Sequence, residues 1–130
     1  MQAAAALFKA LADPIRLRLA VLLAGNGETC VCQLASAVAE PECKISRHLG
    51  VLRAAGMVRA RRHGTWMYYR LVDPRHRLEH CLQECFRDCL NRQAQVTRDR
   101  KRLLQCACAA PEAARRASPR TAKRAAGRRQ

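Results

Sequence analysis

Residues 42–72, ECKISRHLGVLRAAGMVRARRHGTWMYYRLV, combine the pattern of one helix with that of a β-hairpin. Apolar residues that can face a core recur at helical spacing: Ile45, Leu49 and Leu52, with Val51 beside them. Gly56 suits the position just after a helix, and Gly64 lies where a tight turn would join two strands of β-branched and aromatic residues. The stretch therefore predicts a helix over 42–55, followed by a two-stranded hairpin.

The polar side chains of this helix fit a reader of the DNA major groove. They are Lys44, Ser46, Arg47, His48 and Arg53, which can donate hydrogen bonds to bases and phosphates. Near the hairpin tip, Arg61, Arg62 and His63 stand where a wing would meet the DNA backbone. Because two basic elements follow in this order, we favour DNA binding over a merely solvated basic face. We call the helix over 42–55 the reader helix.

Three shorter helical patterns precede the reader helix, over residues 2–11, from Pro14 to the GNG at 25–27, and over 30–39. Asp13 and Pro14 are typical of the cap and the first position of a helix. Helix, short link, helix and hairpin follow one another in the order of a winged helix-turn-helix. The predicted fold class is therefore mainly α with a small β-hairpin.

A helical pattern returns after the hairpin, and its apolar residues form one stripe: Leu78, Leu82, Cys85, Phe86, Cys89 and Leu90. Since little core is left to cover, we expect this stripe to face a partner subunit, which predicts a homodimer through terminal helices. The expected segments are a winged helix-turn-helix DNA-binding and dimerisation domain over 1–92, an extension of the C-terminal helix over 93–108 with Cys106 and Cys108, and a disordered basic tail over 109–130.

The composition points to a polyanionic partner. The 130 residues include 25 Lys and Arg against 10 Asp and Glu, a formal net charge of +15, and cations that neutralise phosphates release condensed counterions. We therefore expect double-stranded DNA as partner, with residues 109–130 either seeking phosphates or acting as a solubilising extension. Without an export signal or a membrane-spanning run, we expect a cytoplasmic protein with no membrane association, whose cysteines stay reduced and bind metals or sense redox state.

Three stretches together resemble one family of regulators: ETCVCQL at 28–34, KISRHLGVLRAAGMV at 44–58 and RRHGTWMYYRL at 61–71. They are similar to the ArsR/SmtB family of metal-responsive winged-helix repressors, particularly its arsenic-responsive branch, over roughly residues 5 to 90. The resemblance implies a homodimer that represses its own arsenic-resistance operon and leaves operator DNA when an ion binds. It implies that Cys30 and Cys32 bind trivalent arsenic or antimony, with arsenite or antimonite as inducer and no permanent cofactor.

Cys30 and Cys32, here called the thiol pair, lie at the start of a predicted helix. With Thr29 as cap they would occupy the first and third helical positions, where the helix dipole lowers the thiol pKa. Residues two apart on a helix point to nearly opposite sides. We therefore hypothesise that closing both sulfurs on one ion unwinds or tilts the first turn and moves the reader helices of the dimer.

One feature departs from the family pattern. The arsenic branch commonly has a third cysteine one turn later, where this sequence has Ala35. The third ligand is then a solvent molecule, a small thiol or another cysteine of this chain, for which Cys106 and Cys108 are our best candidates, reaching the thiol pair within one subunit or across the dimer. For the row formed by Cys81, Cys85 and Cys89, we favour a dimer interface over a second ion site.

Other functions remain open. A repressor on the same fold could respond to cadmium, lead or zinc, although no cysteine precedes Cys30, or to thiol oxidation. An enzyme such as a thiol oxidoreductase or an arsenate reductase is disfavoured. The sequence has no Cys-x-x-Cys on a strand-to-helix turn, no phosphate-binding glycine loop and no paired acids in a cleft-like context.

Overall fold

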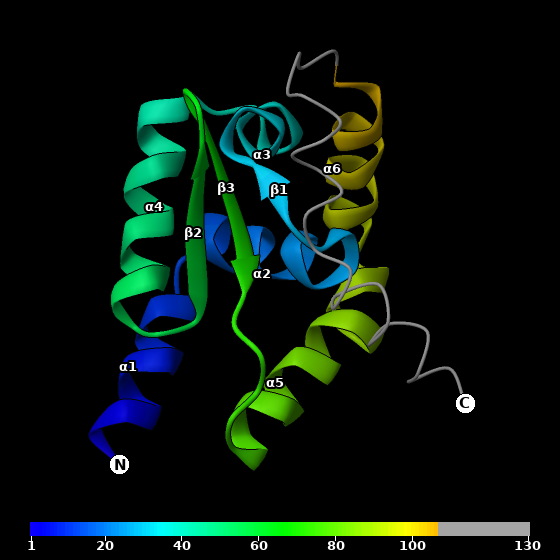
Figure 1. The fold of residues 1–130 in the computed structure, drawn as a ribbon. Coiled ribbons are helices and arrows are strands. Elements are labelled where there is room, and N and C mark those ends of the chain that lie inside the picture. The colour runs from blue at the N-terminus through cyan, green and yellow to red at the C-terminus, as the bar shows by residue number, and fades with distance from the viewer. Residues whose placement is uncertain (107–130) are drawn as a thin grey trace.

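The chain folds into six α-helices and a small antiparallel sheet over residues 1–106, the part of the chain that the computed structural model describes (Figure 1). The elements are α1 (Gln2–Leu11), α2 (Pro14–Asn26), β1 (Thr29–Cys30), α3 (Val31–Val38), α4 (Glu42–Ala54), β2 (Val58–His63), β3 (Trp66–Leu71), α5 (Arg77–Asp88), the 3-10 turn η1 (Leu90–Arg92) and α6 (Ala94–Gln105). This order confirms the predicted fold class. The expected basic tail and Cys108 lie outside the described residues.

The start of α2 follows directly from its sequence. Asp13 adopts an extended backbone conformation, and its side chain accepts a hydrogen bond of 3.1 Å from the backbone N–H of Arg16. Pro14 occupies the first turn, where a missing N–H costs nothing because that group has no partner inside the helix. The predicted cap at Asp13 and Pro14 is confirmed.

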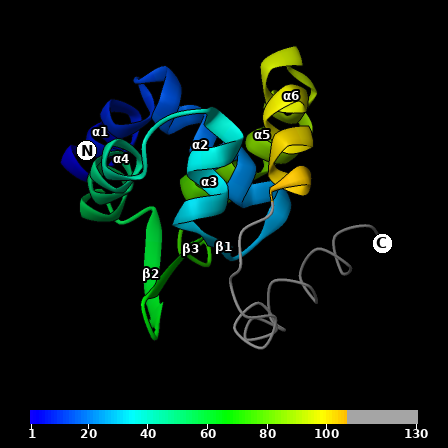
Figure 2. The ribbon, with the colours of Figure 1, turned by 90° about the horizontal axis from the view of Figure 1, so that it is seen from above.

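The β2–β3 hairpin is the wing, and it projects from the helices beside α4 (Figure 2). Its register runs from Val58 opposite Leu71 to His63 opposite Trp66, and Gly64 closes the turn with a φ of 62°. The sequence predicted two strands, but the sheet has a third, with the order β1-β3-β2. A strand of only two residues is too short to show an alternating pattern, so β1 was not predictable.

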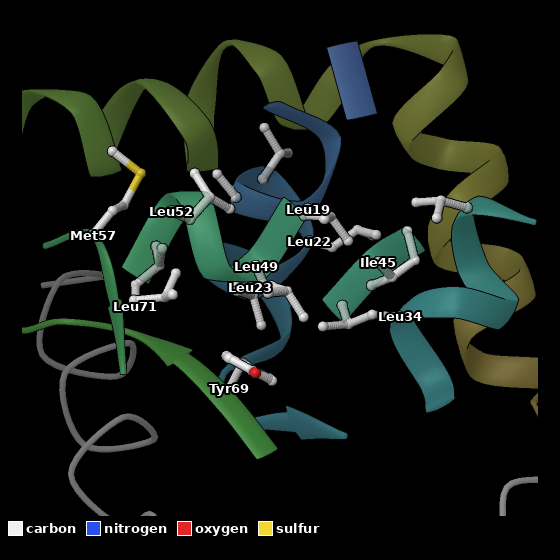
Figure 3. Packing of buried hydrophobic residues seen from close by; sticks show 14 of the residues in the cluster. Leu19, Leu22, Leu23, Leu34, Ile45, Leu49, Leu52, Met57, Tyr69 and Leu71 are labelled. Carbon is white, nitrogen blue, oxygen red and sulfur yellow. The ribbon is translucent and has the colours of Figure 1, made fainter. Parts of the chain in front are cut away.

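The core lies between α2, α3, α4 and the wing, and Figure 3 shows its side chains in contact. It includes Leu19, Leu22, Leu23, Leu34, Ile45, Leu49, Leu52, Met57, Tyr69 and Leu71. Ile45, Leu49 and Leu52 are fully buried as expected, whereas Val51 is 41% exposed. The reader helix is thus anchored by one apolar face, which leaves its opposite face available.

The C-terminal part of the fold corrects two predictions. Of the expected extension over 93–108, the described residues 93–106 do not continue the preceding helix, because α5 ends at Asp88 and α6 is a separate helix that packs against α3. The apolar stripe of α5 is also only partly available to a partner, since Phe86 is 1% exposed in the protein's own core and Leu82 packs against that core. A stripe pattern shows which residues need burial but not which surface buries them.

A buried ion cluster holds α6 in place. Asp99 is 0% exposed and accepts hydrogen bonds from Arg18 of α2, at 2.7 and 2.8 Å, and from Arg102, at 2.9 Å. Arg102 also donates to the backbone oxygen of Ala37 in α3, at 2.8 Å. Asp99 thus joins α6 to α2, and Arg102, which Asp99 holds, joins α6 to α3. In residues 1–106, no helix has the length and hydropathy needed to cross a membrane.

Candidate thiol site and nucleic-acid interface

The thiol pair sits where β1 ends and α3 begins, and its two sulfurs lie 3.0 Å apart. Cys30 is the N-cap residue of α3, with an extended backbone at φ −70° and ψ 144°, so it does not occupy the first helical position as expected. Because Cys30 is not in the helical conformation, its side chain does not follow the angular spacing of the helix, and its sulfur lies next to that of Cys32. A zinc–sulfur bond is about 2.3 Å, so one ion of similar size could contact both sulfurs without unwinding α3.

The surroundings of Cys30 also correct the expected acidity. Cys30 is fully buried and packs against Tyr68, with Val31, Cys32 and Trp66 at the edge of the cluster. Burial raises the pKa of the Cys30 thiol, although the backbone N–H groups of Cys32 and Gln33 act in the opposite direction. The prediction that the helix dipole lowers this pKa is wrong, because removal from water has the larger effect.

A pocket of about 300 Å³ adjoins the thiol pair, lined by Asn26, Glu28, Gln33, Leu103, Leu104 and Cys106. Gln33 connects it to the pair, because its side-chain oxygen accepts a hydrogen bond of 3.3 Å from the backbone N–H of Cys30. The end of α6 thus brings Cys106 to this region within one subunit. Nowhere in residues 1–106 do three His, Cys, Asp or Glu side chains gather closely enough to hold an ion.

The predicted DNA-facing residues of α4 differ in their exposure. Lys44, Ser46, Arg47 and Arg53 are exposed. His48 is half-buried, and its ring nitrogen lies 3.3 Å from the Arg16 guanidinium and 3.8 Å from the Asp13 carboxylate. His48 is therefore turned towards α2, because its position in the helix lies next to the buried Leu49 rather than at the centre of the polar face.

At the wing, Arg62 and His63 are exposed near the turn, as a contact to DNA requires. Arg61 is different, because its guanidinium forms an ion pair with Glu28, a residue directly before β1. Sequence reasoning missed this pair. Glu28 and Arg61 are separated by 33 residues, and no local spacing pattern reports such a contact.

The cysteines of α5, Cys81 and Cys85, and Cys89 at its C-cap make no three-ligand site among the described residues. Cys81 and Cys89 are exposed and Cys85 is half-buried. Burial raises the pKa of Cys85, and the neighbouring Cys89 acts in the same direction. His80 and Glu84 lie 3.7 Å apart on the exposed surface of α5.

Comparison with known sequences identifies similar regulators. Residues 13–60, which contain α2, the thiol pair and α4, match the family described as bacterial regulatory protein, arsR family. An uncharacterised HTH-type transcriptional regulator of Methanocaldococcus jannaschii is 49% identical over 72 residues, 55% of this chain and 81% of that protein. The arsenic resistance transcriptional regulator ArsR1 of Pseudomonas putida is 53% identical over 64 residues, 49% of this chain and 50% of that protein. The chain thus spans about half the length of this arsenic-resistance relative.

Solved structures give the same picture. The antimony-specific transcriptional repressor AntR superposes with a TM-score of 0.53 at 40% identity, covering 60% of this chain and 68% of that one. The homodimeric winged helix-turn-helix DNA-binding domain of Mb0332 from Mycobacterium bovis gives a TM-score of 0.57 at 34% identity, covering 72% of this chain and 86% of that one. Both similarities therefore extend well beyond the helix-turn-helix itself.

Proposed function

Because this chain belongs to the arsR family of bacterial regulatory proteins, we propose that it represses an arsenic-resistance operon. In this proposal it binds double-stranded operator DNA as a homodimer and leaves the DNA when trivalent arsenic or antimony binds Cys30 and Cys32. The inducer is arsenite or antimonite, and the protein has neither a permanent cofactor nor an enzymatic activity. The relatives named for arsenic resistance and for antimony support this choice of inducer.

The observation that carries the proposal is the convergence of the thiol pair. The two sulfurs lie 3.0 Å apart, and soft thiolate ligands select soft acceptors over hard ions such as magnesium or calcium. The pair lies one short helix before α4 and pairs through β1 with the wing. An ion bound there is therefore close to both elements that would contact DNA.

In the proposed complex, the exposed side chains of α4 enter the major groove and the wing contacts the backbone. The contacts come from Lys44, Ser46, Arg47 and Arg53 on α4 and from Arg62 and His63 on the wing. His48 contributes by supporting α4 against α2 through Arg16. The dimer forms through α1 and α5, where Phe8 is 53% exposed and where exposed cysteines line α5.

Replacing one exposed arginine of α4 should weaken specific binding. We expect Arg47→Ala to lower operator affinity roughly tenfold, since a good base contact contributes about 1–3 kcal/mol. Arg62→Ala on the wing should weaken binding to operator and random duplexes alike and reduce the salt dependence. Fluorescence anisotropy on both duplexes at several salt concentrations measures the two effects. Equal losses on operator and random DNA for Arg47→Ala would remove it from the base-reading face.

The buried Cys30 thiol predicts how binding depends on pH. Burial raises its pKa, so the thiol keeps its proton at neutral pH. Arsenite, As(OH)₃, is neutral and can condense with two thiols to give two arsenic–sulfur bonds and two waters, without net proton release. A divalent cation requires thiolates and must displace the Cys30 proton.

Arsenite affinity should therefore change by less than about twofold from about pH 6.5 to about pH 7.5. Cadmium affinity should rise at least about tenfold with that pH increase, one factor of ten for each proton released. Tryptophan fluorescence titrations at each pH, followed through Trp66, check both slopes. A steep pH dependence for arsenite would show that the thiol pair binds it as thiolates.

The choice of inducer is tested by titrating the reduced protein on its own upstream DNA. Fluorescence anisotropy at fixed salt is followed as arsenite, antimonite, cadmium or zinc is added in parallel. We expect release by arsenite or antimonite alone. Release only by the divalent ions would assign the protein to the cadmium, lead or zinc class, and release only by an oxidant would assign it to thiol-redox control.

A further inference from the structure

The thiol pair is joined to the wing by backbone hydrogen bonding. Cys30 is the last residue of β1, which pairs antiparallel with β3, so Cys30 lies opposite Tyr68 and Thr29 opposite Tyr69. Figure 1 shows β1 beside β3 at the base of α3. The wing is therefore one step of the sheet away from Cys30, whereas α4 follows only after the whole of α3 and a link.

The side chains strengthen this connection. Cys30 and Tyr68 are both 0% exposed and pack on each other. Tyr68 in β3 also pairs with Arg61 in β2, the neighbouring strand of the wing. The Arg61 guanidinium lies 5.0 Å from the centre of the Tyr68 ring. A cation over an aromatic face at this distance is attracted by the ring. Tyr68 thus contacts the thiol site through Cys30 and the wing through Arg61.

An ion pair completes the connection. Two nitrogens of the Arg61 guanidinium donate hydrogen bonds to the Glu28 carboxylate, Nη2 at 2.5 Å and Nε at 3.2 Å. The Glu28 side chain is only 5% exposed, and Glu28 precedes Cys30 by two residues. Two parallel charge-assisted bonds hold a guanidinium in a fixed orientation. Arg61 is therefore bonded to Glu28, two residues before Cys30, and contacts Tyr68, which packs on Cys30.

We propose that Arg61 is a positioning residue that transmits occupancy of the thiol pair to the wing through Glu28 and Tyr68. This inference rests on the proposed function, because it names the route by which inducer binding changes DNA affinity. When both sulfurs engage one arsenic atom, Cys30 shifts against Tyr68, and the Glu28–Arg61 pair carries that shift into β2. Arg62 and His63, the next two residues of β2, then leave their positions on the DNA.

The experiment compares Arg61→Gln with wild type in two titrations of the full reduced chain. Arsenite binding is followed by the emission of Trp66, the single tryptophan, which packs at the edge of the Cys30–Tyr68 cluster. Operator affinity is measured by anisotropy with and without saturating arsenite. The coupling is the ratio of the two operator affinities, and couplings between two sites commonly amount to about 5- to 150-fold.

We expect Arg61→Gln to bind arsenite at the wild-type concentration and to keep arsenite-free operator affinity within about twofold, while its coupling falls at least about fivefold. Arg61→Lys retains the charge without the two-pronged geometry and should restore part of the coupling. Arg70→Gln is the matched control: Arg70 is also on the wing sheet, but it pairs with Asp73, so its coupling should equal that of wild type.

Two results would overturn the inference while leaving the proposed function intact. Wild-type coupling in Arg61→Gln would assign transmission to the path from α3 to α4. An equal loss of operator affinity with and without arsenite would make Arg61 a DNA contact. If instead the wild-type protein binds arsenite but keeps its operator, or binds no arsenite, the proposed function fails and the inference fails with it.

Discussion

Cys32→Ser should remain on operator DNA at arsenite concentrations that release the wild-type protein. The two sulfurs of the thiol pair are 3.0 Å apart, and a serine oxygen is a hard ligand that replaces one of these two soft ones. Without the second sulfur, the variant cannot close both attachments on one ion. Wild type should lose about 5- to 150-fold in operator affinity on saturation, the range of typical couplings between sites, and Cys32→Ser less than about twofold.

The measurement is operator anisotropy against arsenite concentration, with affinity for operator in the absence of arsenite as the test of folding. Cys43→Ser is the matched control, since Cys43 is an exposed cysteine outside the thiol pair, outside the proposed dimer interface and not among the proposed DNA contacts. It should release operator as wild type does. Release of Cys32→Ser at the wild-type arsenite concentration would show that another group binds the inducer.

Asp99→Ala should destabilise the fold by about 1.5–3 kcal/mol, the usual contribution of a hydrogen bond to a charged group, because the partly exposed Arg18 and Arg102 can be hydrated after the change. Asp99 is 0% exposed, and its loss leaves Arg18 and Arg102 without their shared carboxylate. The remaining positive charges lie close together between α2 and α6. We therefore expect α6 to separate from α3 more readily than in wild type.

Urea unfolding followed by circular dichroism measures the total loss, and limited proteolysis within α6 measures its separation. Asp88→Ala provides the control, because Asp88 is exposed near the end of α5 and its removal should change stability by less than about 0.5 kcal/mol. Equal stabilities of Asp99→Ala and Asp88→Ala would mean that the buried cluster contributes only to the arrangement of α6.

Local patterns predicted the winged helix well. The spacing of Ile45, Leu49 and Leu52 located α4, and Asp13 with Pro14 located the start of α2, because caps and helical stripes are properties of neighbouring residues. The separate helix α6, Ala94–Gln105, was not predicted, for the opposite reason. The charged residues of α6 cluster in its middle, and nothing local shows that Asp99 would meet Arg18, a residue 81 positions away.

The sequence predicted which residues form the candidate site, but not how their side chains are arranged. The motif singled out Cys30 and Cys32, yet the convergence of their sulfurs depends on the extended backbone of Cys30, which pairs with Tyr68 in β3. The raised pKa of Cys30 has the same origin, since burial against Tyr68 comes from tertiary packing. Both features arise from contacts across the sheet, and the sequence near Cys30 contains no sign of them.

The central claim is that arsenic bound at the thiol pair releases operator DNA. It is tested most directly by counting the arsenic bound per subunit while measuring the fraction of operator released, in one arsenite titration of the reduced protein. We predict that release rises in proportion to occupancy and is complete at one arsenic per subunit. Full occupancy with the operator still bound, or release before arsenic binds, would contradict the account.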